Sequence, residues 1–364
     1  MKKHIKTRNL AQMSPKEWFA WTRKKHGGDR AFAMPKSALD AFIARIPNDD
    51  REKAREVWTS RYQMTYGEIH DDLMLQYLEQ MRPVLKENER AASEKIFFGI
   101  LETFEFNGYA GYTPRGDRVI VLHQGLGNTL SGWSHWFARS VVEEGGLDYL
   151  RRSPEKLVYA LEFTLRAWYG RIKPDMRMPD LYPSTNDGWH LSECLTFSAM
   201  TFVIGHELGH ILHNHDAYTA DTEQNHAMEY EADKTGLSIC LRHSLLKGSY
   251  MPDNYYTKFM LFAPFFALAV MSLLGDSDTD THPSPTSRRD HLLSMYETEA
   301  RSLLGPKYDA VVQEIDEDLF HVIRKNSLST FGVFAEYRGI MESIDIGPRV
   351  VDKSWLRAAL VRAT

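Results

Sequence analysis

Cysteine is scarce in this sequence, because only Cys194 and Cys240 occur among the 364 residues. Both stand inside apolar runs with a helical pattern, so a disulfide framework is not expected and the two side chains are predicted to be small buried hydrophobes. Few cysteines without disulfides fit a reducing compartment. The N-terminus also lacks the basic start, apolar stretch and small-residue cleavage site of an exported protein. The sequence therefore predicts a cytoplasmic protein.

A hydrophobic run long enough to cross a bilayer is also missing. One apolar stretch without charge, Phe259 to Leu274, has sixteen residues and contains Pro264. About 18 to 20 apolar residues are needed to span the hydrocarbon core. The shorter length and the proline favour a buried core helix and predict no membrane span, with membrane association as the alternative.

A large excess of one charge is absent as well. The 44 Lys and Arg against 49 Asp and Glu give a net charge of -5, which is no strong signal for a nucleic-acid partner. The charge is uneven, however. Residues 1–30 hold nine basic and two acidic side chains, which leaves the remainder at -5 - 7 = -12. This basic N-terminal arm is either simply solvated or contacts an acidic partner.

What the sequence does contain is mostly helical pattern. Residues 14–100 have the pattern of helices joined by short breaks. The first helix is predicted to start at Pro15, with Ser14 as N-cap and Glu17 completing a capping box. The turn chemistry of "TPRGD" and the β-branched run "RVIVL" predict a hairpin over about 104–122. The fold class expected is α+β, mainly α.

The remaining organisation follows from composition. Residues 171–189 are rich in Pro and turn residues and predict an irregular surface connection. A buried helix is then expected to begin at Ser192, because Cys194 to Gly205 carries no charge. The predicted division is an N-terminal helical region over 1–100, a core with a small sheet or hairpin over 101–300, and a C-terminal helical region over 301–364.

The stretch "FVIGHELGHILHNH", residues 202–215, places polar chemistry on that buried helix. His206 and His210 are four residues apart and therefore point the same way, so both can ligate one ion. Glu207 stands between them and can reach a metal-bound water. This is the H-E-x-x-H arrangement, in which two imidazoles hold zinc and a carboxylate acts as general base.

A catalytic zinc needs a third protein ligand and one open position. Glu229 in "HAMEYEADKTGL" follows His210 by 19 residues, and an antiparallel second helix would bring it opposite the histidine pair. Asp233, four residues later on the same face, can accept the free N–H of a ligating histidine. His215 and Asp216 are alternative ligands, but no glycine near position 213 offers the turn that they need. For His213 and His215 we expect a place at an exposed helix end rather than a role as metal ligands.

These residues resemble the gluzincin metallopeptidases, within them the group of HtpX and the CAAX prenyl proteases. The resemblance covers "HELGHILHNH" and "EYEADKTGL", then "THPSPTSRRDHL" with His282, Pro283 and Arg288 on matching positions, and upstream "NGYAGYTPRGDRVIVLHQGL". It implies a zincin-like core with zinc on His206, His210 and Glu229. It further implies Glu207 as the base and Asp233 behind a histidine ligand.

The departures limit what the resemblance implies. About 80 residues separate "HQGL" from "HELGH", the loop before Glu229 is short, and the transmembrane helices that usually flank the site are absent. Substrates of the known members are therefore not transferred. A second relative that fits is the phage-exclusion peptidase Lit, another H-E-x-x-H protein.

The function predicted is a soluble zinc metalloendopeptidase acting on a protein or peptide substrate, with Glu207 activating a zinc-bound water. His282 and Arg288 are the catalytic donors expected at the oxyanion, and Asn107 and Tyr109 are weaker offers. The segments 104–109 and 118–122 could pair with an extended substrate. The alternative function is a regulatory or binding module with a structural or autoinhibited zinc site, whose basic arm contacts an acidic partner or nucleic acid.

Overall fold

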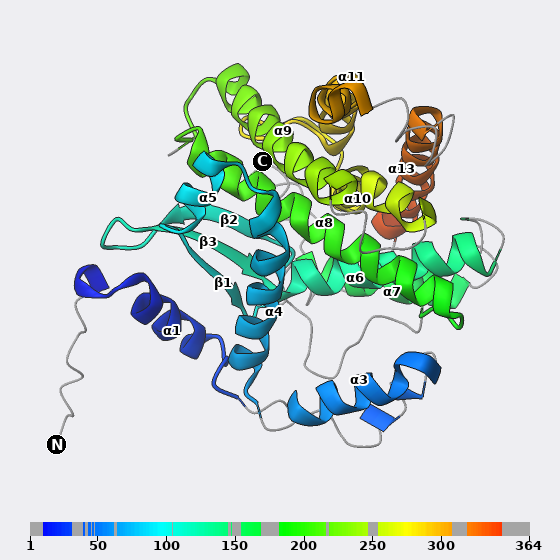
Figure 1. Cartoon of the computed structure of the whole chain (residues 1–364), viewed down its shortest axis with the longest axis horizontal. Coiled ribbons are helices and arrows are strands. Elements are labelled where there is room, and N and C mark those ends of the chain that lie inside the picture. The colour runs from blue at the N-terminus through cyan, green and yellow to red at the C-terminus, as the bar shows by residue number, and fades with distance from the viewer. Residues whose placement is uncertain are drawn as a thin grey trace.

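The fold is α+β and mainly helical, with one small sheet (Figure 1). The computed structural model describes residues 10–30, 39–40, 43–44, 46, 48–61, 64–103, 105–144, 147, 154–168, 182–215, 218–246, 254–307 and 319–343. Several predicted features lie wholly or partly outside the described residues. They are residues 1–9 of the basic arm, part of the helical pattern over 36–46, most of the connection over 171–189, Asp216, and the end of the C-terminal region.

The N-terminal helices are α1 (Pro15–Lys25), α3 (Asn48–Arg61), α4 (Tyr66–Met81) and α5 (Glu87–Ser93), with 3-10 turns η1 (Leu10–Gln12) and η2 (Arg82–Val84). The predicted capping box of α1 is confirmed, because Ser14 Oγ accepts from the Glu17 backbone N–H and Glu17 accepts from the Ser14 N–H. Such caps satisfy backbone donors that a helix start leaves unpaired.

The sheet contains three strands in the order β1-β3-β2, namely β1 (Phe97–Leu101), β3 (Arg118–His123) and β2 (Gly108–Tyr112). β2 and β3 form the predicted antiparallel hairpin, with Gly108 opposite Leu122. β1 runs parallel to β3. Its residues 97–100 belong to the region predicted to be helical, so that prediction is wrong for these four residues. β2 lies at the edge of the sheet, and no strand among the described residues pairs with its outer side.

The remaining helices form the body of the molecule: α6 (Gln124–Val142), α7 (Pro154–Trp168), α8 (Asn186–Leu212), α9 (Thr222–Leu246), α10 (Asn254–Ser272), α11 (Pro285–Leu304) and α13 (Leu319–Ser343), with η5 (Gly305–Lys307). α8 begins six residues earlier than Ser192, because Thr185 caps it by accepting from the Gly188 N–H. Figure 1 shows α8 crossing the middle of the molecule, where it contacts the sheet, α6, α9 and α10.

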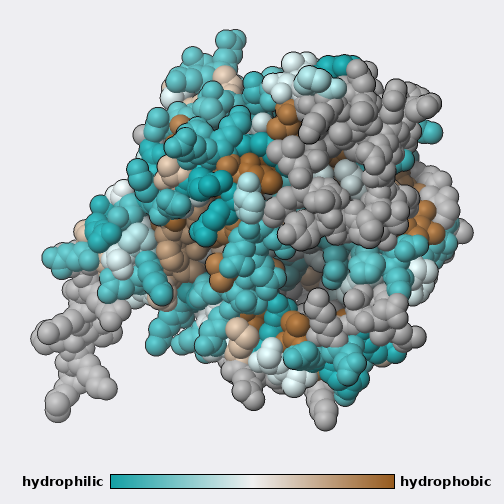
Figure 2. All heavy atoms as spheres, viewed as in Figure 1, coloured by the Kyte–Doolittle hydropathy of each residue, from teal (hydrophilic) through white to brown (hydrophobic). Residues whose placement is uncertain are grey.

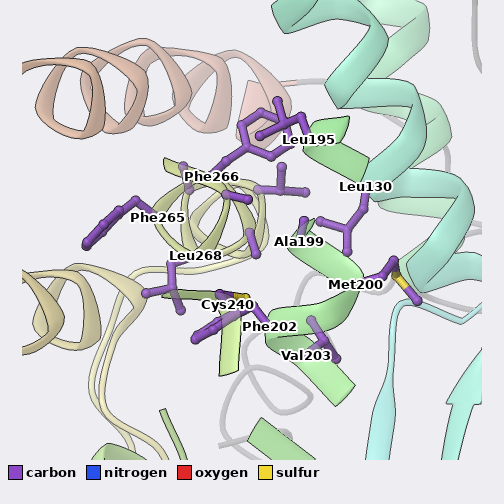
Figure 3. Close-up of a cluster of buried hydrophobic side chains, with 14 of the residues drawn as sticks. Leu130, Leu195, Ala199, Met200, Phe202, Val203, Cys240, Phe265, Phe266 and Leu268 are labelled. Carbon is purple, nitrogen blue, oxygen red and sulfur yellow. The ribbon is translucent and has the colours of Figure 1, made fainter. Parts of the chain in front are cut away.

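The main hydrophobic core lies between α6, α8, α10 and α13. Figure 3 shows side chains of α8, such as Leu195 and Ala199, among Leu130 of α6 and Phe266 of α10. Residues of α10 from Phe259 to Val270 are all buried, so the stretch that could have been a membrane segment is a core helix, as predicted. Cys194 and Cys240 are buried and form no disulfide.

The outer surface carries few exposed apolar residues. In the view of Figure 2, hydrophilic residues dominate the described surface and hydrophobic ones appear as small separate patches. None of the helices in the described part of the chain combines the length and hydropathy that a membrane crossing requires.

Candidate metal site

Helices α8 and α9 touch backbone to backbone through three glycines. A Cβ built on Gly205 would lie 2.9 Å from the Cα of Gly236, and a Cβ on Gly236 would lie 2.7 Å from the carbonyl oxygen of Phe202. Gly209 is as close to Ala232 of α9. Since no side chain separates the two helices here, short acidic side chains of α9 can reach the histidines of α8.

The structure brings together the three side chains predicted as metal ligands. Nε2 of His206 and Nε2 of His210 are 3.1 Å apart. Glu229 offers Oε2 at 3.5 Å from His206 Nε2 and Oε1 at 3.4 Å from His210 Nε2. Among the described residues, these three form the one group of His, Cys, Asp or Glu side chains with metal-ligand spacing. We call them the candidate metal site.

The other ring nitrogens of the two histidines are already engaged. His206 Nδ1 lies 2.9 Å from Asp233 Oδ1, and because an ionised carboxylate only accepts, this nitrogen carries the proton. His210 Nδ1 lies 3.1 Å from Nδ1 of His215. Burial lowers the pKa of His210 to about 3, and the charge of His206 adds to this effect. His210 is therefore a neutral imidazole, the form that binds metals.

The geometry fits a zinc ion. Zinc binds imidazole nitrogen and carboxylate oxygen at about 2.0 to 2.2 Å in a tetrahedron, which separates neighbouring ligand atoms by about 3.3 Å. The three distances of 3.1, 3.5 and 3.4 Å are close to this value. In addition, Glu229 Oε2 is buried and has no hydrogen-bond partner, and a buried acceptor without a partner is costly unless a cation meets it.

A buried arginine compensates the buried carboxylates beside the candidate metal site. Arg288 donates to Asp233 from Nε at 2.7 Å and from Nη2 at 2.5 Å, and both side chains are buried. Burial alone would raise the pKa of Asp233, but the Arg288 guanidinium holds it well below its usual range. Burial would likewise raise the pKa of Glu229, and the charges of His206 and Arg288 lower it instead. Both carboxylates are therefore ionised although they are buried.

Glu207 faces the sheet rather than the three ligands. Its carboxylate accepts the backbone N–H of Ala110 in β2, and burial raises the pKa of Glu207 above its ordinary value, with the charge of His206 opposing. Tyr109, on the same strand, is 36% exposed. Asn107 uses its side-chain oxygen to accept the Gly108 N–H, so this predicted donor caps the strand start.

His282 stands at the opposite rim, next to a tyrosine that sequence reasoning missed. The hydroxyl of Tyr218 donates to Glu229 Oε1 at 2.8 Å and lies 2.7 Å from His282 Nε2. Asn225 of α9 connects the loop that contains Tyr218 with the loop that contains His282, because its side-chain amide donates to the backbone carbonyls of Thr219 and Asp280. The sequence feature that could have indicated Tyr218 as a site residue is its position in the short loop between the histidines and Glu229.

The end of α8 corrects one argument from the sequence. No glycine stands near His213, yet the chain does turn, because Asn214 adopts φ 58° in the left-handed region that Asn tolerates. His215 is consequently folded back against His210, with its side chain only 8% exposed. The expectation of an exposed helix end is wrong for His215. Asp216, the other alternative ligand, lies outside the described residues.

A peptidase family matches this region. Residues 142–307 match the sequence model of the Peptidase U49 family. The match covers less than half of the chain but contains all seven predicted site residues and leaves out the sheet. Neither the curated proteins nor the solved structures include a match. The family match supports a peptidase, and hence protein or peptide substrates, while the gluzincin class and the zinc remain predictions.

Proposed function

We propose that this protein is a zinc-dependent metalloendopeptidase of the gluzincin type, with zinc held by His206, His210 and Glu229. The observation that carries the proposal is the pair of Nε2 atoms 3.1 Å apart. Burial alone would lower the pKa of His206, but the hydrogen bond to Asp233 and the nearby carboxylates raise it above its ordinary value. Metal binding would therefore displace the proton of Nε2, while Asp233 keeps the other proton on Nδ1 and leaves the Nε2 lone pair for the ion. Two such nitrogens and a buried carboxylate converge on one point that suits a cation.

When bound, zinc supplies Lewis acidity, which polarises a substrate carbonyl and makes a water molecule acidic enough to attack it. The protein's own part begins with Glu207, which accepts the proton of the attacking water and delivers it to the leaving amine. Its raised pKa suits this task, because a base works best when its pKa approaches the working pH. The Ala110 N–H fixes the carboxylate while it does so.

Charge that develops on the carbonyl oxygen needs donors across the site from Glu207. His282 has its Nε2 3.5 Å from Glu229 Oε1, and we propose that it donates to the reacting oxygen. Arg288, the other expected donor, has its guanidinium on Asp233. We therefore propose that Arg288 acts through Asp233 and orients His206, rather than contacting substrate.

The substrate class follows from the strand beside the base. Ala110 directs its N–H to Glu207 and therefore away from β3, so this side of β2 lacks a strand partner. An extended peptide can pair with such an edge through backbone hydrogen bonds, with little demand on its sequence. We propose a protein or peptide substrate bound along β2. The two buried cysteines, which form no disulfide, fit a reducing compartment, and we propose the cytoplasm.

Metal removal tests the proposal. The purified protein is screened against a peptide library, with cleavage read by mass spectrometry, and any cleaved peptide becomes the substrate. Dialysis against a zinc chelator should abolish cleavage, and one equivalent of zinc should restore it. Cleavage that continues at full rate in chelated, zinc-free protein would contradict the proposed function.

A further inference from the structure

The segment that follows α8 is built against the candidate metal site. The backbone N–H of His215 donates to the carbonyl of His210 at 2.8 Å, which closes the turn made by Asn214. Arg118 of β3 fixes that turn from outside, donating to the carbonyl of Ile211 at 2.7 Å and to Asn214 Oδ1 at 2.8 Å. The position of the His215 ring is therefore determined by three separate elements, α8, β3 and the turn.

A chain of hydrogen bonds leads from this ring to an acidic residue of α9. His215 Nδ1 is 3.1 Å from His210 Nδ1, and His215 Nε2 is 3.0 Å from Glu231 Oε2. The neighbouring His213 contacts the other oxygen of the same carboxylate, with Nδ1 3.2 Å from Glu231 Oε1. His213 makes no contact with His210 in the described hydrogen bonds and ion pairs.

The direction of each hydrogen bond follows from Glu231. A carboxylate only accepts, so His215 must carry its proton on Nε2. With that proton on Nε2, the Nδ1 of His215 is the acceptor in the contact with His210, and His210 donates from its own Nδ1. The lone pair of His210 is thereby left on Nε2, where the candidate metal site needs it. Glu231 thus sets the tautomer of His210 through an intervening ring, whereas Asp233 sets that of His206 directly.

We propose that His215 is a positioning residue that fixes the orientation and tautomer of His210 for metal binding, with Glu231 fixing His215 in turn. The inference rests on the proposed function, because it concerns the same ion. Partners of this kind typically contribute a factor of about 10 to 100 to metal affinity.

Two isosteric variants separate the two contacts of His215. The amide oxygen of Asn in His215→Asn can take the place of ring Nδ1, so this variant keeps an acceptor for His210 and loses Glu231. The longer side chain in His215→Gln reaches the place of Nε2, so it keeps the Glu231 contact and loses the acceptor for His210. His215→Ala removes both contacts. The matched control is His213→Ala, which removes the second contact on Glu231, a contact with Thr235 and the ring stacked beside His215, but leaves both hydrogen-bonding nitrogens of His215 in place.

The measurement is the zinc dissociation constant of the metal-free proteins, obtained by competition with a chelator of known affinity. We expect His215→Ala and His215→Gln to weaken zinc binding about 10- to 100-fold. His215→Asn should recover to within about 3-fold of wild type, as should His213→Ala. Thermal unfolding of the metal-free proteins reports whether each variant is folded. If His215→Ala does not fold, the comparison of Asn with Gln still decides the question.

Three outcomes would overturn this inference. Equal zinc affinity in wild type and all His215 variants would show that His210 needs no partner. Recovery by Gln and not by Asn would assign the effect to Glu231 rather than to the contact with His210. A wild-type protein that binds no zinc at all would refute the proposed function itself, and that result differs from the first two because it appears before any substitution.

Discussion

Two buried regions share helix α8 and differ in how they treat polar groups. The aromatic core packs its rings together, with Phe266 of α10 in contact with Phe137 of α6 at a centroid distance of 5.6 Å. His135 of α6 is buried and meets no charged partner among the described residues; burial lowers its pKa to about 3, so it stays neutral. In the candidate metal site the buried carboxylates of Asp233 and Glu229 remain ionised instead.

The difference shows what separates a functional cluster from a structural one. Burial is nearly equal, with Phe266 at 0% exposure and Glu229 at 1%. The core holds neutral groups and gains from apolar area removed from water. The candidate metal site holds buried charge at a cost, and the Nε2 atoms of His206 and His210 lie within 3.5 Å of the Glu229 carboxylate. Predictions that damage one region and spare the other test this distinction.

The largest effect is expected from Glu207→Gln. Glutamine has the same shape and can still accept the Ala110 N–H, but it cannot take a proton from water. Hydrolysis should fall by about 100- to 10,000-fold, while zinc content stays at the wild-type value. Initial rates on any peptide that the wild type cleaves provide the measurement. A variant that retains more than a tenth of the wild-type rate would show that Glu207 is not the base.

In the core, Phe266→Ala should have the opposite profile. Removing a ring that is completely buried leaves a cavity and should lower the free energy of unfolding by about 3 to 5 kcal/mol. Urea denaturation measures this change. The folded protein should bind zinc as wild type does, so loss of zinc from folded Phe266→Ala would mean that the two regions are not independent.

Gly236→Ala disturbs the contact that joins the two regions. The added Cβ would meet the Phe202 carbonyl oxygen at 2.7 Å, so α8 and α9 must move apart and zinc affinity should decrease. Overpacking of this kind costs about 1 to 3 kcal/mol of stability. The matched control is Gly332→Ala in α13, where a Cβ meets no atom within 4 Å and stability should not fall. Equal behaviour of the two variants would refute the role of close packing.

The smallest effect concerns pH. The pKa of His135 is about 3 in the folded protein and about 6.5 in an unfolded chain. Between these values the unfolded state binds more protons, so stability is lost as the pH falls below about 6.5. From pH 7 to 5.5 the loss should be about 1 kcal/mol for this group. His135→Phe keeps the ring and should reduce the pH dependence by that amount, as measured by urea denaturation at both pH values.

Local sequence patterns could predict much of this fold and site. The period of an α-helix was enough to predict that His206 and His210 share a face and that Glu229 lies on a second helix. Predicting β1 was harder, because a continuous apolar run such as "FFGIL" does not distinguish a strand from a buried helix. The start of α8 depends on Glu143, the C-cap residue of α6, which accepts from the backbone N–H groups of Ser184 and Thr185. Such a tertiary contact leaves no periodic signal.

The roles of Tyr218 and His215 could not be predicted for a similar reason. Tyr218 meets His282 across 64 residues of sequence, and only the packing of two loops on Asn225 brings them together. His215 reaches His210 because a single asparagine adopts a left-handed conformation, which occurs in only a few per cent of residues other than glycine. Sequence patterns therefore predicted the three candidate metal ligands but not Tyr218 and His215, which contact them.

The most direct test of the account is the zinc content of the protein, measured by elemental analysis after purification without added metal. Wild type and Glu229→Ala are prepared in parallel. The account predicts about one zinc per wild-type chain and substantially less in the variant, because two imidazoles alone hold zinc weakly. Equal zinc in both proteins would contradict the assignment of Glu229, and no zinc in either would contradict the metal site itself.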